Sequence, residues 1–326
     1  MDIAFGPVPS RRLGRSLGIN NIPPKHCSYA CVYCQVGPTP EQEITPRPFY
    51  LPEEILRQVR SRLEDVHAHG EAVDYLTFVP DGEPTLDSRL GESIDALREL
   101  GLPIAVISNA SLLWHADVRS ALCRADWVSV KIDSVVPRAW ERINRPHGVL
   151  RLADILGGIE RFATEFGGRL VSETMLVDGL NDGGEDIAAL GRFIAATRIG
   201  RAYLAIPHRP PAVAGVRAPD EALVLRAFRT LTEQGIEVEL LTAYEGDVFA
   251  FGGDLRAEIL AISAVHPLRT SAVQALLQKG GGSMALVDEL LAAGELHRLE
   301  HAGEVFYLRR LRREGCGSSP GMSASG

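Results

Sequence analysis

Short apolar runs alternate with amphipathic helical segments along most of this chain, and this alternation limits the possible folds more than any other feature. Six runs have the nearly continuous apolar character of parallel strands that are covered on both faces. They occupy residues 73–79, 103–108, 127–132, 170–177, 201–206 and 236–242. Repeated strand–helix units predict a parallel sheet with right-handed crossovers. The expected fold class is therefore α/β, as an open sheet or as a full or partial barrel.

The segments between these runs have helical periodicity. In 52–68, apolar residues recur on one face, and Pro52 stands in the first turn, where proline is favoured. Asp87 is a suitable N-cap for a second helix, whose buried face should carry Leu90, Ile94 and Leu97. Further helices are expected at 113–124, 152–166, 184–197 and 219–234. In both open sheets and barrels, ligands bind beyond the carboxyl ends of the strands.

From about residue 264 the pattern changes to helix, Gly-rich turn, helix and a hairpin around Ala302 and Gly303. The second of these helices presents Val287, Leu290 and Leu291, which is the outline of a small winged-helix-like α+β unit. Its arginines and glutamates nearly balance, so a structural cap or partner-docking module is favoured over DNA binding. The predicted division is a core at 1–245, a helical connector at 246–263, this unit at 264–314 and a disordered tail at 315–326.

Composition excludes several classes of protein. No stretch approaches the roughly 18 apolar residues that a membrane span requires, and the first residues do not resemble a signal peptide. We therefore expect a cytoplasmic protein. The net charge of −8 argues against a general nucleic-acid binder, which is usually basic.

Three of the five cysteines lie close together in a C-x3-C-x2-C arrangement, as Cys27, Cys31 and Cys34. In a reducing compartment such a cluster indicates metal binding or redox chemistry. A structural zinc ion would need a fourth ligand, such as the neighbouring His26. A [4Fe–4S] cluster normally takes four cysteines, so three would leave one iron open to another ligand.

The remaining cysteines are not expected to be ligands. Cys123 falls in a predicted helix among apolar residues, which favours a buried structural thiol, and Cys316 falls in the tail.

The C-x3-C-x2-C loop, with the aromatic Tyr33 before its last cysteine, resembles that of the radical S-adenosylmethionine (radical SAM) superfamily. Gly82, Glu83 and Pro84, one strand–helix unit later, resemble the GxP-type element that binds the methionine amino group in that family. The resemblance implies one [4Fe–4S] cluster on the three cysteines, with S-adenosylmethionine on the open iron. Reductive cleavage of S-adenosylmethionine then gives a 5′-deoxyadenosyl radical, which abstracts hydrogen from the substrate.

Polar residues at two further strand ends fit the same family. Ser108 and Asn109, and also Lys131 and Asp133, occupy positions that commonly hold the methionine carboxylate and the ribose hydroxyls. Polar residues at strand ends are nevertheless usual in any α/β protein. Glu173 lies within a predicted strand, where its charge indicates either a polar contact inside a barrel or a marker of strand register.

The resemblance covers about residues 15–245 and implies a partial (β/α)6 barrel. Within the superfamily, it is strongest to the branch that contains wyosine-base synthases of transfer RNA and uncharacterised iron–sulfur oxidoreductases. The chain lacks the basic composition of those synthases and the cysteines for a second cluster, so their substrate does not carry over. The substrate could be an RNA nucleoside, a peptide or a small metabolite, and the expected electron donor is a flavodoxin or ferredoxin.

Arginines near the start of the chain could contact an anionic substrate near the barrel rim. Arg11, Arg12 and Arg15 precede the strand that leads into the cysteine loop, and His208 with Arg209 follows the run 201–206. Solvated surface is the simpler interpretation of the first group. A functional alternative for the whole chain is a non-catalytic iron–sulfur or zinc adaptor that docks a partner through its winged-helix-like end.

Overall fold

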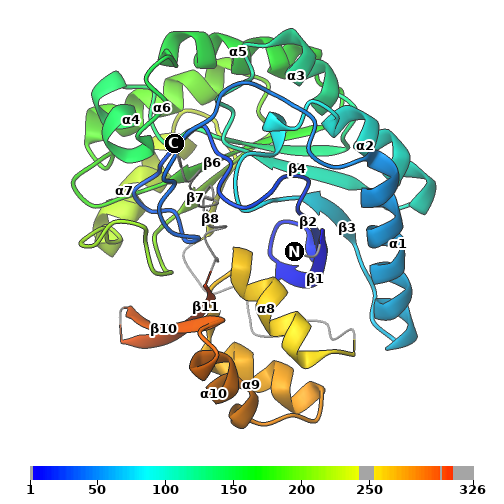
Figure 1. Cartoon of the computed structure of the whole chain (residues 1–326). Helices are drawn as coiled ribbons and strands as arrows, with labels where there is room; N and C mark the ends of the chain where they lie inside the picture. The colour runs from blue at the N-terminus through cyan, green and yellow to red at the C-terminus, as the bar shows by residue number, and fades with distance from the viewer. Residues whose placement is uncertain (1–2, 242–252, 302, 311–326) are drawn as a thin grey trace, which may run out of the picture.

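The computed structural model describes residues 3–241, 253–301 and 303–310 (Figure 1). Its largest element is an eight-stranded sheet with the strands in chain order. The strands are β1 (Ala4–Ser10), β2 (Gly14–Ile19), β3 (Tyr75–Phe78), β4 (Ile104–Ser108), β5 (Trp127–Lys131), β6 (Arg169–Met175), β7 (Arg201–Ala205) and β8 (Val238–Leu241). The sheet is curled, and its outer face carries the helices. The predicted α/β class and partial barrel are confirmed.

The covering helices lie between successive strands from β2 to β8, and two of them follow β5. They are α1 (Pro52–Ala68), α2 (Leu90–Leu97), α3 (Ala116–Leu122), α4 (Pro137–Asn144), α5 (Leu152–Glu165), α6 (Gly184–Ala196) and α7 (Glu221–Thr232), with short 3-10 turns η1 (Pro84–Leu86) and η2 (Arg98–Leu100). From β2 to β8 every neighbouring pair is parallel. The carboxyl ends of seven strands therefore meet at one edge of the sheet, which we call the carboxyl edge.

The two faces of the sheet are both apolar, as the unbroken apolar runs predict. Toward the helices, Leu76, Phe78 and Val106 are completely buried, and burying each such side chain contributes about 1.5–3 kcal/mol. On the inner face, Trp127 and Tyr203 belong to a separate apolar cluster. This cluster extends to the carboxyl ends of the strands, where Met175, Ala205 and Leu241 line the cavity together with polar residues.

The N-terminal hairpin was not predicted. β1 pairs antiparallel with β2, and the turn between them inserts Leu13 into the inner apolar cluster. The prolines and glycine of "FGPVPS" hide this strand from a pattern-based search, because they are uncommon within strands. The hairpin closes the amino-terminal side of the barrel and brings the arginines beside Leu13 to its interior.

Two local expectations were wrong. Asp87 does not cap α2, because η1 comes first and α2 begins at Leu90; the Asp87 carboxylate accepts instead from the Arg89 backbone N–H (3.0 Å). Cys123 is exposed rather than buried, because α3 ends at Leu122 and leaves it in the C-cap position. The buried face of α2, including Ile94, is as predicted.

The C-terminal unit packs beside the N-terminal hairpin of β1 and β2. It contains α8 (Leu255–Val265), β9 (Leu268–Arg269), α9 (Thr270–Lys279), α10 (Met284–Ala292), β10 (Leu296–His301) and β11 (Glu304–Arg309), with strand order β10–β11–β9. It has its own core, to which Val287 and Leu290 contribute. A partly buried ion pair between Arg62 of α1 and Glu258 of α8 joins it to the barrel.

The helices and the hairpin expected in this unit are present, while the winged-helix assignment and the domain boundaries stay predictions. The boundary at 245, Ala302, Cys316 and the tail fall outside the described residues. Among the helices that the structure describes, none has both the length and the apolar character to span a bilayer.

Candidate functional site

A cavity of about 300 Å³ opens at the carboxyl edge, inside the curl of the sheet. Most of the predicted site residues line it: Arg11, Arg12, Cys27, Cys31, Tyr33, Cys34, Gly82, Glu83, Ser108, Asn109, Lys131, His208 and Arg209. Three predicted residues, Arg15, Pro84 and Asp133, are not among its lining residues. The parallel strands thus bring together side chains that are far apart in the sequence.

The cysteine loop follows β2 and is fixed by its backbone rather than by regular secondary structure. The Val32 N–H donates to the Ile143 carbonyl at the end of α4 (2.9 Å), and the Ala30 N–H donates to that of Asn144 (3.1 Å). Val32 is buried and packs against Ile143 and Val177. One apolar anchor inside the cysteine motif therefore holds the loop against the barrel.

The three thiols face the same cavity and differ from ordinary surface cysteines in their acidity. Burial raises the pKa of Cys27 and Cys34, and it raises the pKa of Cys31 to about 12. Without a metal the thiols therefore stay protonated, while metal ligation requires thiolates. In the described part of the chain, no group of His, Cys, Asp or Glu is placed to hold a single metal ion. A cubane cluster binds each thiolate through a different iron, so this donor set fits a [4Fe–4S] cluster.

The Gly82–Pro84 segment lies directly against the cysteine loop. The Glu83 N–H donates to the His26 carbonyl (2.9 Å). A Cβ atom added to Gly82 would lie 2.1 Å from the same oxygen, so only glycine allows this approach. The close approach expected of Gly82 is thus present. Pro84 begins η1 and is buried behind the cavity wall.

The Glu83 carboxylate is 1% exposed and accepts four hydrogen bonds from its own surroundings. Oε1 accepts from the Thr85 N–H (3.1 Å), the Thr85 hydroxyl (2.6 Å) and the Ser108 hydroxyl (2.8 Å). Oε2 accepts from the Asn109 backbone N–H (2.7 Å). Burial raises the pKa of Glu83, and these bonds oppose that effect. Glu83 therefore joins the ends of β3 and β4 as well as lining the cavity.

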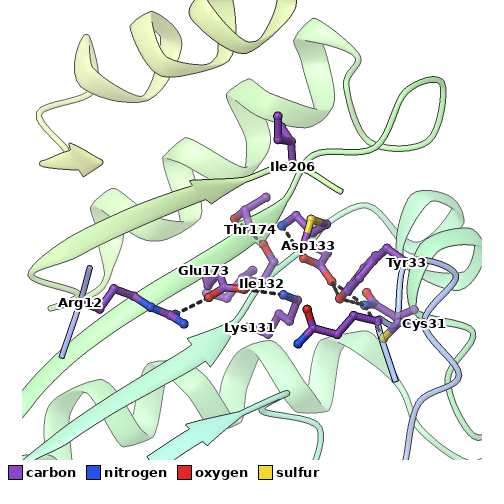
Figure 2. Close-up of polar contacts among 12 residues, drawn as sticks. Arg12, Cys31, Tyr33, Lys131, Ile132, Asp133, Glu173, Thr174 and Ile206 are labelled. Atoms are coloured by element: carbon purple, nitrogen blue, oxygen red, sulfur yellow. Dashed lines mark hydrogen bonds and ion pairs between the residues drawn. The ribbon is translucent and has the colours of Figure 1, made fainter. Parts of the chain in front are cut away.

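Figure 2 shows a row of charged side chains on the inner wall, in which Glu173 lies between Arg12 and Lys131. Lys131 Nζ is 2.7 Å from Glu173 Oε1, and Arg12 binds Oε2. Burial alone would raise the pKa of Glu173, but Lys131 and Arg12 outweigh it and lower the pKa to about 2. The charge within the predicted strand is thus a polar contact inside the barrel.

Asp133 is held by neighbours beside the cavity and is 4% exposed. Its Oδ2 atom accepts from the Tyr33 hydroxyl and from Asn144 Nδ2 (2.6 Å), and Oδ1 accepts from the Met175 N–H (2.8 Å). Figure 2 shows Tyr33 and Asp133 pointing toward each other next to Cys31. These contacts connect Asp133 to the cysteine loop rather than to the cavity.

The predicted anion-contact residues separate into two groups. Arg15 lies at the amino-terminal end of β2, away from the cavity, where it forms a half-exposed ion pair with Asp74 (2.7 Å), so its expected position at the rim was wrong. Arg209 lines the cavity and donates to Gln35 Oε1 (2.7 Å). Burial, reinforced by Arg209, lowers the pKa of His208 to about 4.

Sequence reasoning missed two residues around the site. Asp81 lines the cavity and is 1% exposed, and its Oδ1 atom lies 3.7 Å from Lys25 Nζ. Burial raises the pKa of Asp81 to about 7, although the nearby Lys25 acts in the opposite direction. Asp81 stands immediately before the Gly82–Pro84 motif, and this position in the sequence could have identified it as a site residue. Asn144 approaches Cys31 from the end of α4, a helix absent from the prediction, so no sequence signal pointed to it.

Comparisons with known proteins agree with this geometry. A family model described as the Radical SAM superfamily matches residues 21–193, more than half of the chain. A UPF0026 protein of Methanocaldococcus jannaschii is 41% identical over 314 residues, which cover 96% of this chain and 97% of that protein.

Solved structures share the fold at low sequence identity. A radical SAM methyltransferase from Sphaerobacter thermophilus is 17% identical with a TM-score of 0.52, over 70% of this chain and 67% of its own. TYW1 with a lysine–pyruvate adduct bound is 16% identical with a TM-score of 0.53, over 67% of this chain and 73% of its own. These structures support the fold, and the family model, which covers more than half of the sequence, shows that this chain belongs to the radical SAM superfamily.

Proposed function

We propose that the protein is a radical SAM enzyme with one [4Fe–4S] cluster on Cys27, Cys31 and Cys34 and S-adenosylmethionine in the same cavity. The observation that supports this most directly is that the three thiols and the Gly82–Glu83 segment line one cavity, and that the Glu83 N–H donates to the carbonyl of His26, the residue before Cys27. Three cysteines leave one iron for an exogenous ligand, which the adjacent cavity can accommodate. Family membership does not favour the non-catalytic adaptor.

When bound, the cluster and S-adenosylmethionine supply a 5′-deoxyadenosyl radical that can remove a hydrogen atom from a substrate. The protein's residues bind and orient the reactants and exclude water. Lys131 would offer a cation to the methionine carboxylate, because Glu173 and Asp133 raise its pKa against the effect of burial and keep it charged. Carbonyl groups of the Gly82–Pro84 segment would accept from the methionine ammonium, and the Ser108 hydroxyl donates to the Glu83 side chain of this segment.

The substrate and the electron donor are also part of the proposal. The inner wall of the cavity carries Arg12 and Lys131 with Glu173 between them, so the substrate has to present polar groups to this part of the wall. An RNA nucleoside, a peptide and a small metabolite all meet that requirement. A flavodoxin- or ferredoxin-type protein would deliver the electron.

Metal analysis after anaerobic reconstitution tests the cluster. The wild-type protein should bind about four irons and four acid-labile sulfides per chain. Changing all three motif cysteines to serine should abolish this uptake, whereas Cys123→Ser, a matched exposed cysteine outside the cavity, should leave it unchanged. One tightly bound zinc in place of iron would contradict the proposal.

A further inference from the structure

Two asparagines from distant parts of the chain point their side-chain amides at two of the three motif cysteines. Asn109 Nδ2 is 3.5 Å from Cys27 Sγ, and Asn144 Nδ2 is 3.4 Å from Cys31 Sγ. Asn109 follows the end of β4, and Asn144 is the last residue of α4. Both distances are compatible with N–H···S hydrogen bonds.

The amide orientation of each asparagine is fixed by other hydrogen bonds. Asn109 Oδ1 accepts from the Ser111 backbone N–H (2.9 Å), so its NH2 group has to face the sulfur. Asn144 Nδ2 also lies 2.6 Å from Oδ2 of Asp133. A carboxylate oxygen can only accept a hydrogen bond, so the atom of Asn144 that faces it has to be the donor nitrogen. The nitrogen atom, rather than the oxygen, therefore faces the cysteine in both cases.

A buried carboxylate holds each asparagine in place. Glu83 Oε2 accepts from the backbone N–H of Asn109 at 2.7 Å, and Asp133 Oδ2 accepts from the side chain of Asn144. The two carboxylates are 1% and 4% exposed. Each of the two cysteines thus faces an asparagine that is itself bound to a buried carboxylate, through the backbone for Asn109 and through the side chain for Asn144.

We propose that Asn109 and Asn144 are positioning residues that hold Cys27 and Cys31 through N–H···S hydrogen bonds, and that they strengthen cluster retention and raise the cluster's reduction potential. This inference rests on the proposed function. Partners of metal ligands orient those ligands and tune the metal. Hydrogen bonds to the sulfurs also set the potential of an iron–sulfur cluster, because they stabilise the additional negative charge of its reduced form.

Single Asn109→Leu and Asn144→Leu variants test the proposal, since leucine has a similar size and no donor. In an EPR-monitored redox titration, each variant should have about tenfold less reduced cluster at a given potential, a shift of about 59 mV to more negative values for one electron. Each should also bind iron about tenfold more weakly in competition with a chelator.

Asn181→Leu is the matched control. Asn181 is 3% exposed, close to the 2% of Asn144, and it donates to the Asp133 and Met175 carbonyls but to no cysteine. Its variant should lose a similar amount of thermal stability and keep the wild-type potential. An equal shift in this control, or unchanged potential and iron retention in both test variants, would overturn the proposal.

The wild-type protein provides a second readout if a leucine variant does not fold or take up iron. With 15N-labelled asparagine, the reduced cluster should show hyperfine coupling to side-chain amide nitrogens, and the absence of this coupling would overturn the inference. Failure of the wild-type protein to assemble a cluster would instead contradict the proposed function, so the two failures are distinguishable.

Discussion

Lys131 Nζ lies 2.7 Å from Glu173 Oε1 on the inner wall of the barrel, and Arg12 binds the other oxygen of the same carboxylate. The two cations come from the end of β5 and from the turn that precedes β2. The N-terminal hairpin lies outside the matched family region and yet contributes a charged group to the cavity. The same three charged side chains therefore hold the hairpin against two barrel strands and form a polar part of the cavity wall.

These three charged side chains predict acid sensitivity of the metal-free protein. Lys131 and Arg12 lower the pKa of Glu173 to about 2, below that of the unfolded chain, so its contribution to stability exists above pH ~4.3. The free energy of unfolding should then fall by about 3 kcal/mol between pH ~4.3 and 2, on top of the contributions of other carboxylates.

Glu173→Gln checks this prediction in urea unfolding at several pH values. The variant should be less stable at pH 7 by about 3–5 kcal/mol, because two buried cations lose their partner. It should also lack the additional loss below pH ~4.3. A variant whose stability follows the wild-type pH dependence would contradict this role of Glu173.

Gly82→Ala should separate the Gly82–Pro84 segment from the cysteine loop. The new methyl group would meet the His26 carbonyl at 2.1 Å, and such overpacking typically costs about 1–3 kcal/mol. Urea unfolding should show this loss, and equilibrium dialysis should show weaker S-adenosylmethionine binding. Gly167→Ala, where a Cβ meets nothing within 4 Å, is the control and should bind normally. Equal binding by both variants would exclude a role for the close contact.

Glu83→Ala should weaken S-adenosylmethionine binding while the cluster's absorbance persists. The substitution leaves the Ser108 hydroxyl and two backbone N–H groups without their acceptor, at a cost of about 1–3 kcal/mol for each buried group. Binding measured at a temperature well below the melting point of the variant isolates the effect on the site. Wild-type affinity would mean that Glu83 only stabilises the loop.

The double change Cys123→Ala and Cys316→Ala should leave the iron content at the wild-type value. Cys123 is exposed at the end of α3 and lines no part of the cavity. Colorimetric iron and sulfide assays of the reconstituted variant provide the measurement. A loss of about half the iron would indicate a second cluster and a different kind of enzyme.

The repeating units of the barrel were predictable, and the packing around the site was not. Apolar runs such as 127–132 identify strands because both faces of a parallel sheet are covered. The motif spacing likewise identifies Cys27, Cys31 and Cys34. In contrast, the contact of Asn144 with Cys31 depends on where α4 ends in space, which no local pattern encodes.

Arg15 and Asp133 were predicted as site residues, but neither lines the cavity. Both have chemistry suited to a ligand site, but each is held by a partner that only the fold brings near. Asp74 holds Arg15 at the far end of β2, and Asn144 holds Asp133 beside the cysteine loop.

The most direct test of the central claim is the formation of 5′-deoxyadenosine. Reconstituted wild-type protein, incubated anaerobically with S-adenosylmethionine and dithionite, should release 5′-deoxyadenosine and methionine in equal amounts by liquid chromatography and mass spectrometry. The variant with all three motif cysteines changed to serine should release neither. Intact S-adenosylmethionine in the presence of a fully assembled and reduced wild-type cluster would contradict the account.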